Sequence, residues 1–208
     1  MSTDPVSTTY IWFDLEFTDL NPHKASILQV AILATDVHLN PLTSADTGLN
    51  LIIRIDPDET VSPWVEENLP NLLARCHSTE ALDPKSVEQQ IIDYVARLAG
   101  PVAEEIKERP VLAGNSVHND WRLADMHYPR FVERLHYRLM DVSTLKLHWQ
   151  DWLGNAEFDK DDPGNVEAYL PFDSAPLAGA PHDAYYDILA SIAELNFYRR
   201  HLLAAGGT

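Results

Sequence analysis

The chain has little cysteine and no long hydrophobic run. Its 208 residues include one cysteine, Cys76, so no disulfide can form within the chain and a reducing compartment is expected. Apolar runs such as Ile32-Leu33-Ala34 are far shorter than the roughly 20 residues that cross a bilayer. The opening Met-Ser-Thr-Asp-Pro lacks the basic and apolar segments of a secretory signal. We therefore expect a cytoplasmic protein with no membrane partner.

Basic residues are also scarce. Lysine and arginine together number 15 against 32 acidic residues, which gives a formal net charge of −17. Extended duplex nucleic acid is an improbable partner for such a surface, because proteins bind it by neutralising phosphates with lysine and arginine. A small phosphate-bearing substrate stays possible, since bound divalent cations can concentrate positive potential where the phosphate binds.

The composition is that of a globular protein, and residues 1–208 are expected to form one domain. Hydrophobic residues make up 45% and charged residues 23%, with neither internal repeats nor low-complexity tracts. Residues 153–181 differ, because they are rich in acids, glycine and proline and show no sustained period. We expect this segment to be a long loop inserted within the domain, and such loops are usually functional or mobile.

The order of expected elements indicates an α/β fold. Apolar and β-branched runs predict strands at residues 10–18, 27–34 and 49–55, joined by short turns into an antiparallel meander. Further strands are expected at 111–113 and 139–140. Cap and proline signals predict helices from Ser62-Pro63 and Asp83-Pro84. Further helices are expected at residues 120–125 and 142–152, and a terminal helix that includes Ala184 is expected to run to about residue 203. This order implies a mixed sheet with helices on its faces.

The stretch Tyr10-Ile-Trp-Phe-Asp-Leu-Glu-Phe-Thr18 carries two acids where a buried strand should have none. Side chains alternate along a strand, so Asp14 and Glu16 share one face, about 7 Å apart by the usual rise per residue. In apolar surroundings, two such carboxylates stay ionised together only when a cation lies between them. The pattern therefore favours a divalent metal site, although an edge strand with a wet polar face would show the same pattern.

Three later stretches extend this motif: Gly114-Asn-Ser-Val-His-Asn-Asp120, His136-Tyr-Arg-Leu-Met-Asp-Val-Ser-Thr144 and His182-Asp-Ala-Tyr-Tyr-Asp187. In order and spacing, the four stretches resemble the oligoribonucleases, a branch of the DEDDh 3′-to-5′ exonucleases, over nearly the whole chain. The resemblance implies an RNase H-like fold with a mixed five-stranded sheet and helices on both faces. It also implies a hydrolase that degrades short single-stranded RNA from the 3′ end to 5′-mononucleotides.

The resemblance assigns catalytic roles to five residues. Asp14, Glu16, Asp120 and Asp187 match the family's metal-binding acids, and their oxygen ligands suit two Mg²⁺ or Mn²⁺ ions. His182 matches the general base that accepts a proton from the attacking water. Each residue also has an ordinary interpretation, because Asp120 could be a helix N-cap, Asp187 a solvated acid in a first helical turn, and His182 a surface histidine.

The same resemblance predicts a set of substrate-binding residues: Phe17, Thr18, Leu20, Asn115, Ser116, Tyr137, Arg138 and Ser143. Within it, Ser116, Arg138 and Ser143 match groups that cap a 5′ phosphate, which an arginine fork fits bidentately. Leu20 matches a leucine that wedges between two bases, and Tyr137 an aromatic residue that the family contributes across a homodimer interface. Core packing for Leu20 and Tyr137, and a structural ion pair for Arg138, are the alternatives.

The chain departs from the family pattern at several positions. Asp19 replaces a glycine, and Gln29 replaces an acid on the second strand. Leu72 aligns with the base-stacking tryptophan, and Trp64 lies too far upstream to replace that tryptophan without a shift. A lost stacking partner costs roughly 1–3 kcal/mol per base, so weaker or relaxed substrate binding is expected. The alternatives are an exonuclease acting on longer RNA or DNA 3′ ends, and a catalytically silent nucleotide-binding module.

Overall fold

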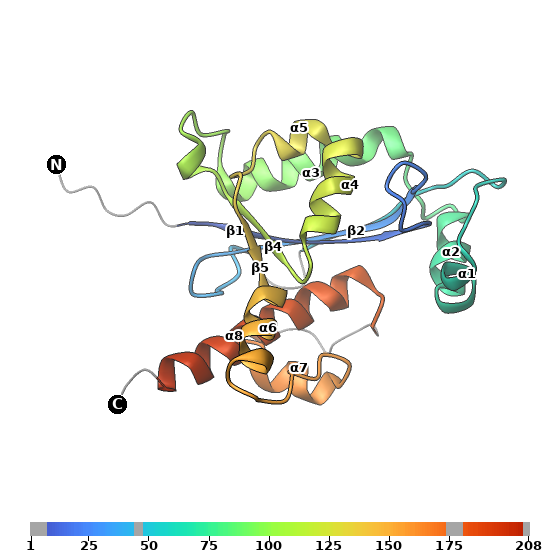
Figure 1. Ribbon diagram of the computed structural model, residues 1–208. Coiled ribbons are helices and arrows are strands. Elements are labelled where there is room, and N and C mark those ends of the chain that lie inside the picture. The colour runs from blue at the N-terminus through green and yellow to red at the C-terminus, as the bar shows by residue number, and fades with distance from the viewer. Residues whose placement is uncertain (1–7, 44–47, 174–180, 206–208) are drawn as a thin grey trace.

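A five-stranded mixed sheet runs through the centre of the molecule (Figure 1). The computed structural model describes residues 8–43, 48–173 and 181–205, with the side chains of 203–205 left out. The strands lie in the order β3-β2-β1-β4-β5. They are β1 (Tyr10–Phe17), β2 (Ile27–Thr35), β3 (Leu49–Ile52), β4 (Val111–Gly114) and β5 (Leu139–Asp141). The first three are antiparallel neighbours, while β4 and β5 run parallel to β1, so the predicted meander within a mixed sheet is confirmed.

Helices cover both faces of the sheet (Figure 1). One face carries α3 (Pro84–Ala99), α4 (His118–His127) and α5 (Pro129–Val132). The other face carries α6 (Val142–Asp151), α7 (Pro163–Tyr169) and α8 (Ala184–Ala205). Two short helices, α1 (Pro63–Asn68) and α2 (Pro70–Cys76), lie beyond one end of the sheet, and a 3-10 turn, η2 (Ile106–Glu108), precedes β4.

The alternation along β1 separates two hydrophobic cores. Ile11, Phe13 and Leu15 are buried in the core that includes residues of α3, α4 and α5. Trp12 points the other way, into the core shared with α8. Asp14 and Glu16 continue the Trp12 face toward the end of the strand, as the period of two predicts. Asp14 and Glu16 therefore lie beyond the apolar contacts between β1 and α8, close to the first turn of α8.

The helix starts follow the predicted capping chemistry. The Ser62 hydroxyl accepts a hydrogen bond from the Val65 amide, and the Asp83 carboxylate accepts one from the Lys85 amide. Each of these caps is followed by a proline at the first helical position. Asp120 is different, because α4 begins at His118 and its cap residue is Val117. The interpretation of Asp120 as an N-cap is therefore wrong.

The largest differences from the predicted elements lie in two segments. The segment 153–181 contains α7, which the absence of a sustained period concealed because the helix is only seven residues long. Its first turn is stabilised by Asp162, whose carboxylate accepts a hydrogen bond from the Gly164 amide. Residues 174–180 of the segment lie outside the described residues. Strand β3 ends at Ile52 rather than at residue 55, and Ile53 continues as an isolated bridge to Leu82.

Across the described ranges, no helix combines the length and apolar character needed to cross a membrane.

Candidate active site

A cavity of about 570 Å³ opens at the carboxyl end of β1. Five predicted catalytic residues reach it from four places in the chain. Asp14 and Glu16 come from β1, Asp120 from the first turn of α4, Asp187 from the first turn of α8, and His182 from the turn before α8. The structure therefore brings together acids that are more than 170 positions apart in the sequence. Their catalytic roles remain predictions that this proximity permits.

The backbone of β1 holds the Asp120 side chain in place. The Asp120 carboxylate accepts a hydrogen bond of 3.0 Å from the Leu15 amide, which joins α4 to the middle of the Asp14-Leu15-Glu16 stretch. Asp120 is only 6% exposed, so this bond is shielded from water. Its burial against β1 fixes the Asp120 side chain beside Asp14 and Glu16 rather than in solvent.

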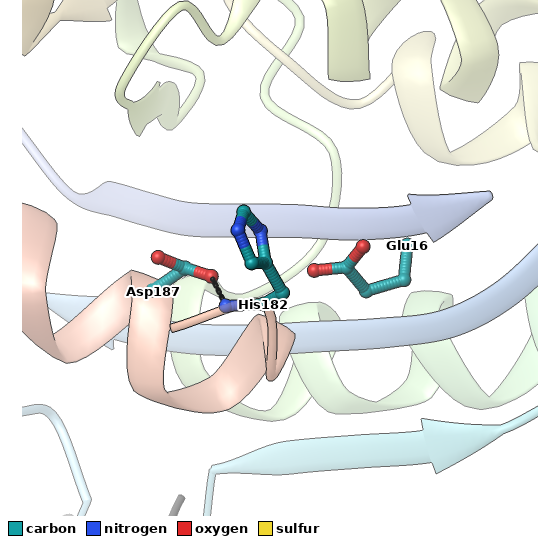
Figure 2. A group of neighbouring side chains, drawn as sticks. All are labelled: Glu16, His182 and Asp187. Carbon is teal, nitrogen blue, oxygen red and sulfur yellow. Dashed lines mark hydrogen bonds between the residues drawn. The ribbon is translucent and has the colours of Figure 1, made fainter. Parts of the chain in front are cut away.

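His182 adopts a left-handed backbone conformation, with φ of 70°. Non-glycine residues occupy this region rarely, and such positions often occur at functional sites. The His182 amide donates a hydrogen bond of 2.9 Å to Asp187 Oδ2, which fixes the turn against the helix (Figure 2). One potential ligand atom from each of Glu16, His182 and Asp187 lies within 4.8 Å of the others. The three side chains can therefore surround a single small ion or water.

Asp14, Glu16 and Asp120 resist ionisation in the absence of a cation. Burial, followed by the charges of Asp187 and Asp120, raises the pKa of Glu16 to about 8. Burial also raises the pKa of Asp120 to about 7, although the hydrogen bond from the Leu15 amide opposes the shift. The pKa of Asp14 is raised well above its usual range, by burial and then by its acidic neighbours. Closely spaced, desolvated carboxyls fit hard divalent cations, which supply the missing positive charge.

Gln29, which replaces an acid of the family pattern, holds the start of α8. It lies opposite Glu16 in the β1–β2 pairing and is 1% exposed. Its Oε1 accepts a hydrogen bond of 3.2 Å from the Ala184 amide, and its Nε2 donates one of 3.4 Å to Asp183. The departure from the family pattern therefore places a neutral side chain where it can position the turn that carries His182.

The predicted substrate-binding residues separate into two groups. Phe17, Leu20, Asn115 and Ser116 line the cavity. Ser143 lies directly behind them, where its hydroxyl accepts a hydrogen bond of 2.9 Å from the Ser116 amide and donates one of 3.2 Å to Asn115 Oδ1.

Thr18, Tyr137 and Arg138 are not among the described residues that line the cavity. Thr18 is fully buried and structural, because its hydroxyl accepts a hydrogen bond of 3.0 Å from the Ser26 amide. Tyr137 is 71% exposed, with the Arg138 guanidinium 5.5 Å from the centre of its ring. Tyr137 is thus not a core residue, and both side chains face outward.

Trp64 lines the cavity, although its distance along the sequence had excluded it as a substrate-binding residue. The backbone amide of Ser62 donates a hydrogen bond of 2.9 Å to the Thr18 carbonyl, which attaches α1 to the end of β1. Trp64 follows at the second position of α1. Its ring centre lies 5.0 Å from that of His182, and the planes of the two rings meet at 85°, in an edge-to-face contact. Leu72, by contrast, is 7% exposed and packs in a core with Leu28 and Ile52. The inference that the site lacks a tryptophan is therefore wrong.

Lys160 is a second cavity residue that the sequence analysis missed. Its Nζ lies 3.3 Å from Asp187 Oδ1, and the side chain reaches the cavity from the segment between α6 and α7. No motif in the sequence marks this lysine. An exposed aromatic just after a helix cap could have drawn attention to Trp64, whereas the position of Lys160 depends entirely on tertiary packing.

The fold and the site together define a class of protein. Carboxylates that converge at the end of the central strand of this mixed sheet are the arrangement of the RNase H-like nucleases, which depend on divalent metal ions.

Comparison with known proteins specifies the family. A family model described as exonuclease matches residues 11–195. A mitochondrial oligoribonuclease of Mus musculus is 34% identical over 196 residues, covering 92% of this chain and 72% of the relative. An oligoribonuclease of Tropheryma whipplei is 30% identical over 98% of each chain. The solved nuclease domain of 3′hExo, a DEDDh family member bound to rAMP, shares the fold with a TM-score of 0.53 at 14% identity, covering 98% of this chain and 96% of that one.

The chain belongs to the exonuclease family and, within it, to the oligoribonucleases of the DEDDh branch. It is a hydrolase that acts as a 3′-to-5′ exonuclease, and the predicted RNase H-like fold is confirmed.

Proposed function

We propose that this exonuclease degrades very short single-stranded RNA to 5′-mononucleotides with two bound divalent cations, Mg²⁺ or Mn²⁺. The observation that carries the proposal is the meeting of Asp14, Glu16, Asp120, Asp187 and His182 around one cavity. A cavity of about 570 Å³ is the size of a small-molecule site, which falls in a range of roughly 300–1,000 Å³. A few nucleotides at the 3′ end fit such a space, whereas a long strand would have to extend out of it.

The four carboxylates would hold the cations. When bound, two such ions activate a water for attack on the phosphodiester and stabilise the oxygen that leaves. The raised pKa of Glu16, about 8, means that cation binding must displace protons from the carboxyls at neutral pH. The chain contributes a rigid set of oxygen ligands, because β1, α4 and α8 each fix at least one of them.

His182 would act as the general base. Its ring is beside the carboxylates of Glu16 and Asp187, and its backbone is fixed by the hydrogen bond to Asp187 (Figure 2). Imidazole is suited to accept a proton near neutral pH. The proton taken from the attacking water would thus be held on a side chain that is exposed and can release it to solvent.

The walls of the cavity would bind the bases. Trp64 is 48% exposed and Leu20 is 90% exposed, although both line the cavity. Exposed apolar side chains at a nucleotide site can stack on a base or wedge between two bases. Trp64 supplies the aromatic face whose apparent absence had favoured an enzyme for longer RNA or DNA, so that alternative loses its main support.

The phosphate farthest from the cut site would be bound by Ser116 and Ser143, with Arg138. The two serine hydroxyls are 3.2 Å apart, and the Asp141 carboxylate accepts hydrogen bonds of 3.0 Å from both of their backbone amides. Tyr137 is 71% exposed, as a contribution to a second copy of the chain in a homodimer requires. Light scattering at micromolar concentration tests the homodimer, which a monomer mass would exclude.

The proposed activity is tested by following the hydrolysis of a 5′-phosphorylated diribonucleotide with Mg²⁺ or Mn²⁺. We expect mononucleotide products, loss of activity with a chelator, and a higher rate than on a twenty-residue RNA or DNA. A faster rate on the long strand would instead support the alternative exonuclease. Nucleotide binding without hydrolysis in either metal would indicate a silent binding module.

A further inference from the structure

Lys160 is the one lysine or arginine among the described residues that line the cavity. Five acids line the same cavity: Asp14, Glu16, Asp19, Asp120 and Asp187. The Lys160 ammonium pairs with Asp187 at 3.3 Å, and its side chain is 39% exposed, while that of Asp187 is 12% exposed. The free enzyme therefore contains an internal counter-ion on an acid that is expected to bind metal.

The backbone of Lys160 is anchored on both sides. Its carbonyl accepts a hydrogen bond of 2.9 Å from the Tyr186 hydroxyl of α8. Two residues earlier, Phe158 is 3% exposed and packs in the core against Phe197. Two residues later, Asp162 caps the start of α7. The segment thus directs Lys160 into the cavity by specific packing, so its position there is a built feature of the fold.

The charge of Lys160 is maintained by its acidic surroundings. Burial alone lowers the pKa of its ammonium, but the charge of Asp187, the hydrogen bond with it, and the charges of Asp14 and Asp161 raise the pKa above its ordinary value. In return, the lysine lowers the pKa of Asp14 and Glu16 a little, against the larger upward shifts. The ammonium is therefore positive at the pH at which the enzyme would work.

A divalent cation bound to Asp187 would repel this ammonium, because the two like charges would share one carboxylate. The Lys160 backbone is fixed, but four methylene groups let the ammonium move within the cavity. The acids of the cavity would then be neutralised by the cations. The strongest remaining partner for the ammonium would be a phosphate oxygen of the bound RNA.

We propose that Lys160 exchanges partners, pairing with Asp187 in the free enzyme and binding a substrate phosphate once the cations are in place. The inference rests on the proposed function and adds a phosphate-binding residue that lies outside the four sequence stretches of the family pattern. Lys160 would weaken the binding of metal to the empty site and strengthen the binding of nucleotide to the metal-loaded site. Cation and phosphate would thus be favoured together over either one alone.

Two binding measurements test the exchange. Calorimetry would give the affinity of Mn²⁺ without nucleotide, and the affinity of adenosine 5′-monophosphate at saturating Mn²⁺. In Lys160→Met, which keeps an unbranched side chain that is shorter only by the ammonium group, we expect Mn²⁺ to bind about 5–10-fold more tightly and the nucleotide about tenfold more weakly. Lys160→Arg should stay within about threefold of wild type in both affinities, since it keeps the charge.

Lys146→Met is the matched control, because Lys146 forms an ion pair with Glu157 and does not line the cavity. It should bind both ligands as the wild type does. Unchanged affinities in Lys160→Met would overturn the exchange, and so would a change in only one of the two. The proposed function is judged separately, by hydrolysis of the diribonucleotide by the wild type. If the wild type hydrolyses it and Lys160→Met binds normally, only the inference about Lys160 fails.

Discussion

The carboxylate floor of the cavity (Asp14, Glu16, Asp120 and Asp187) and its rim (Leu20, Trp64, Lys160 and His182) are built in different ways. Each floor residue lies within a regular strand or helix and is at least partly buried. The rim residues come from turns, a six-residue helix and an irregular segment, and each of them is at least partly exposed. The floor depends on the whole fold, whereas each rim residue depends on a few tertiary contacts.

This difference separates two functions. A floor fixed by the sheet and two helices can hold cations in constant positions, as catalysis requires. A rim attached by single contacts, such as that between Ser62 and Thr18, can differ between relatives without loss of the fold. We therefore expect changes in the floor to abolish the reaction and changes in the rim to alter binding or rate by smaller factors.

Asp120→Asn should have the largest effect. The asparagine oxygen can still accept the hydrogen bond from the Leu15 amide, but the negative charge is lost. Bound cations supply several kcal/mol of transition-state stabilisation, so the rate should fall by roughly 1,000-fold or more. The thermal stability of the metal-free protein should be retained, because no buried charge is left unpaired. Kinetics on the diribonucleotide and calorimetry of folding measure both quantities.

Asp125→Asn provides the control for this substitution, because Asp125 lies on the same helix but is exposed to solvent. Its activity should match the wild type. An Asp120→Asn enzyme that cuts RNA as fast as the wild type would remove Asp120 from the metal site.

The pH dependence of stability tests the floor without substrate. The pKa of Glu16 rises from 4.5 to about 8, and that of Asp120 from 3.8 to about 7, so the metal-free folded protein retains protons that the unfolded chain releases. The associated stability is fully present below those ordinary values and is lost as pH rises through 7 and 8. The melting temperature without metal should therefore fall between pH 5 and 8.5, by roughly 5–10 °C.

Mn²⁺ should reverse this trend, since cations bind the deprotonated carboxylates. In Glu16→Gln the melting temperature of the metal-free protein should fall less steeply with pH. This difference separates the effect of Glu16 from that of the net charge of −17. Calorimetric melting at constant ionic strength provides the measurement. Equal slopes in the wild type and in Glu16→Gln would show that Glu16 does not titrate in this range.

His182→Ala tests the rim residue closest to the chemistry. Loss of a general base costs about 100-fold or more in rate. The affinity for Mn²⁺ distinguishes a base from a metal ligand, because His182 lies close enough to Glu16 and Asp187 to act as either. We expect kcat to fall by about 100-fold with the Mn²⁺ affinity unchanged. His77→Ala, at an exposed histidine after α2, should have no effect, and a loss of Mn²⁺ affinity in His182→Ala would make His182 a ligand.

The part of the floor on β1 was predictable from a local rule, because the period of two along the strand places Asp14 and Glu16 on one face. Asp120 and Asp187 were assigned by the resemblance to the oligoribonucleases, since taken alone each has an ordinary structural interpretation. The short meander of β1, β2 and β3 also follows from apolar runs separated by turns. In these cases the local pattern and the global fold agree.

The rim was not predictable because no local pattern encodes it. Trp64 reaches the cavity through the hydrogen bond between Ser62 and Thr18, and matching residues by sequence alone selected the buried Leu72 instead. Lys160 depends on the burial of Phe158 and on the hydroxyl of Tyr186, both of which are tertiary contacts. Helix α7 was missed for a related reason, since seven residues are too few to show a period.

Trp64→Ala should have the smallest effect among these changes and sharpens the comparison between the floor and the rim. Loss of one stacked base costs roughly 1–3 kcal/mol, so KM for the diribonucleotide should rise by about tenfold, with less change in kcat. Trp152→Ala, at an aromatic that is 78% exposed and does not line the cavity, should leave KM unchanged.

Leu72→Ala gives the opposite pattern and decides between the two candidate positions for base stacking. Leu72 packs against Leu28 and Ile52, so its truncation should lower the free energy of unfolding by about 2–5 kcal/mol while KM at low temperature stays that of the wild type. Steady-state kinetics and denaturant unfolding of both variants provide the measurements. If Leu72→Ala raised KM and Trp64→Ala did not, the residue that contacts the base would lie on α2. The assignment of Trp64 to the substrate-binding rim would then be wrong.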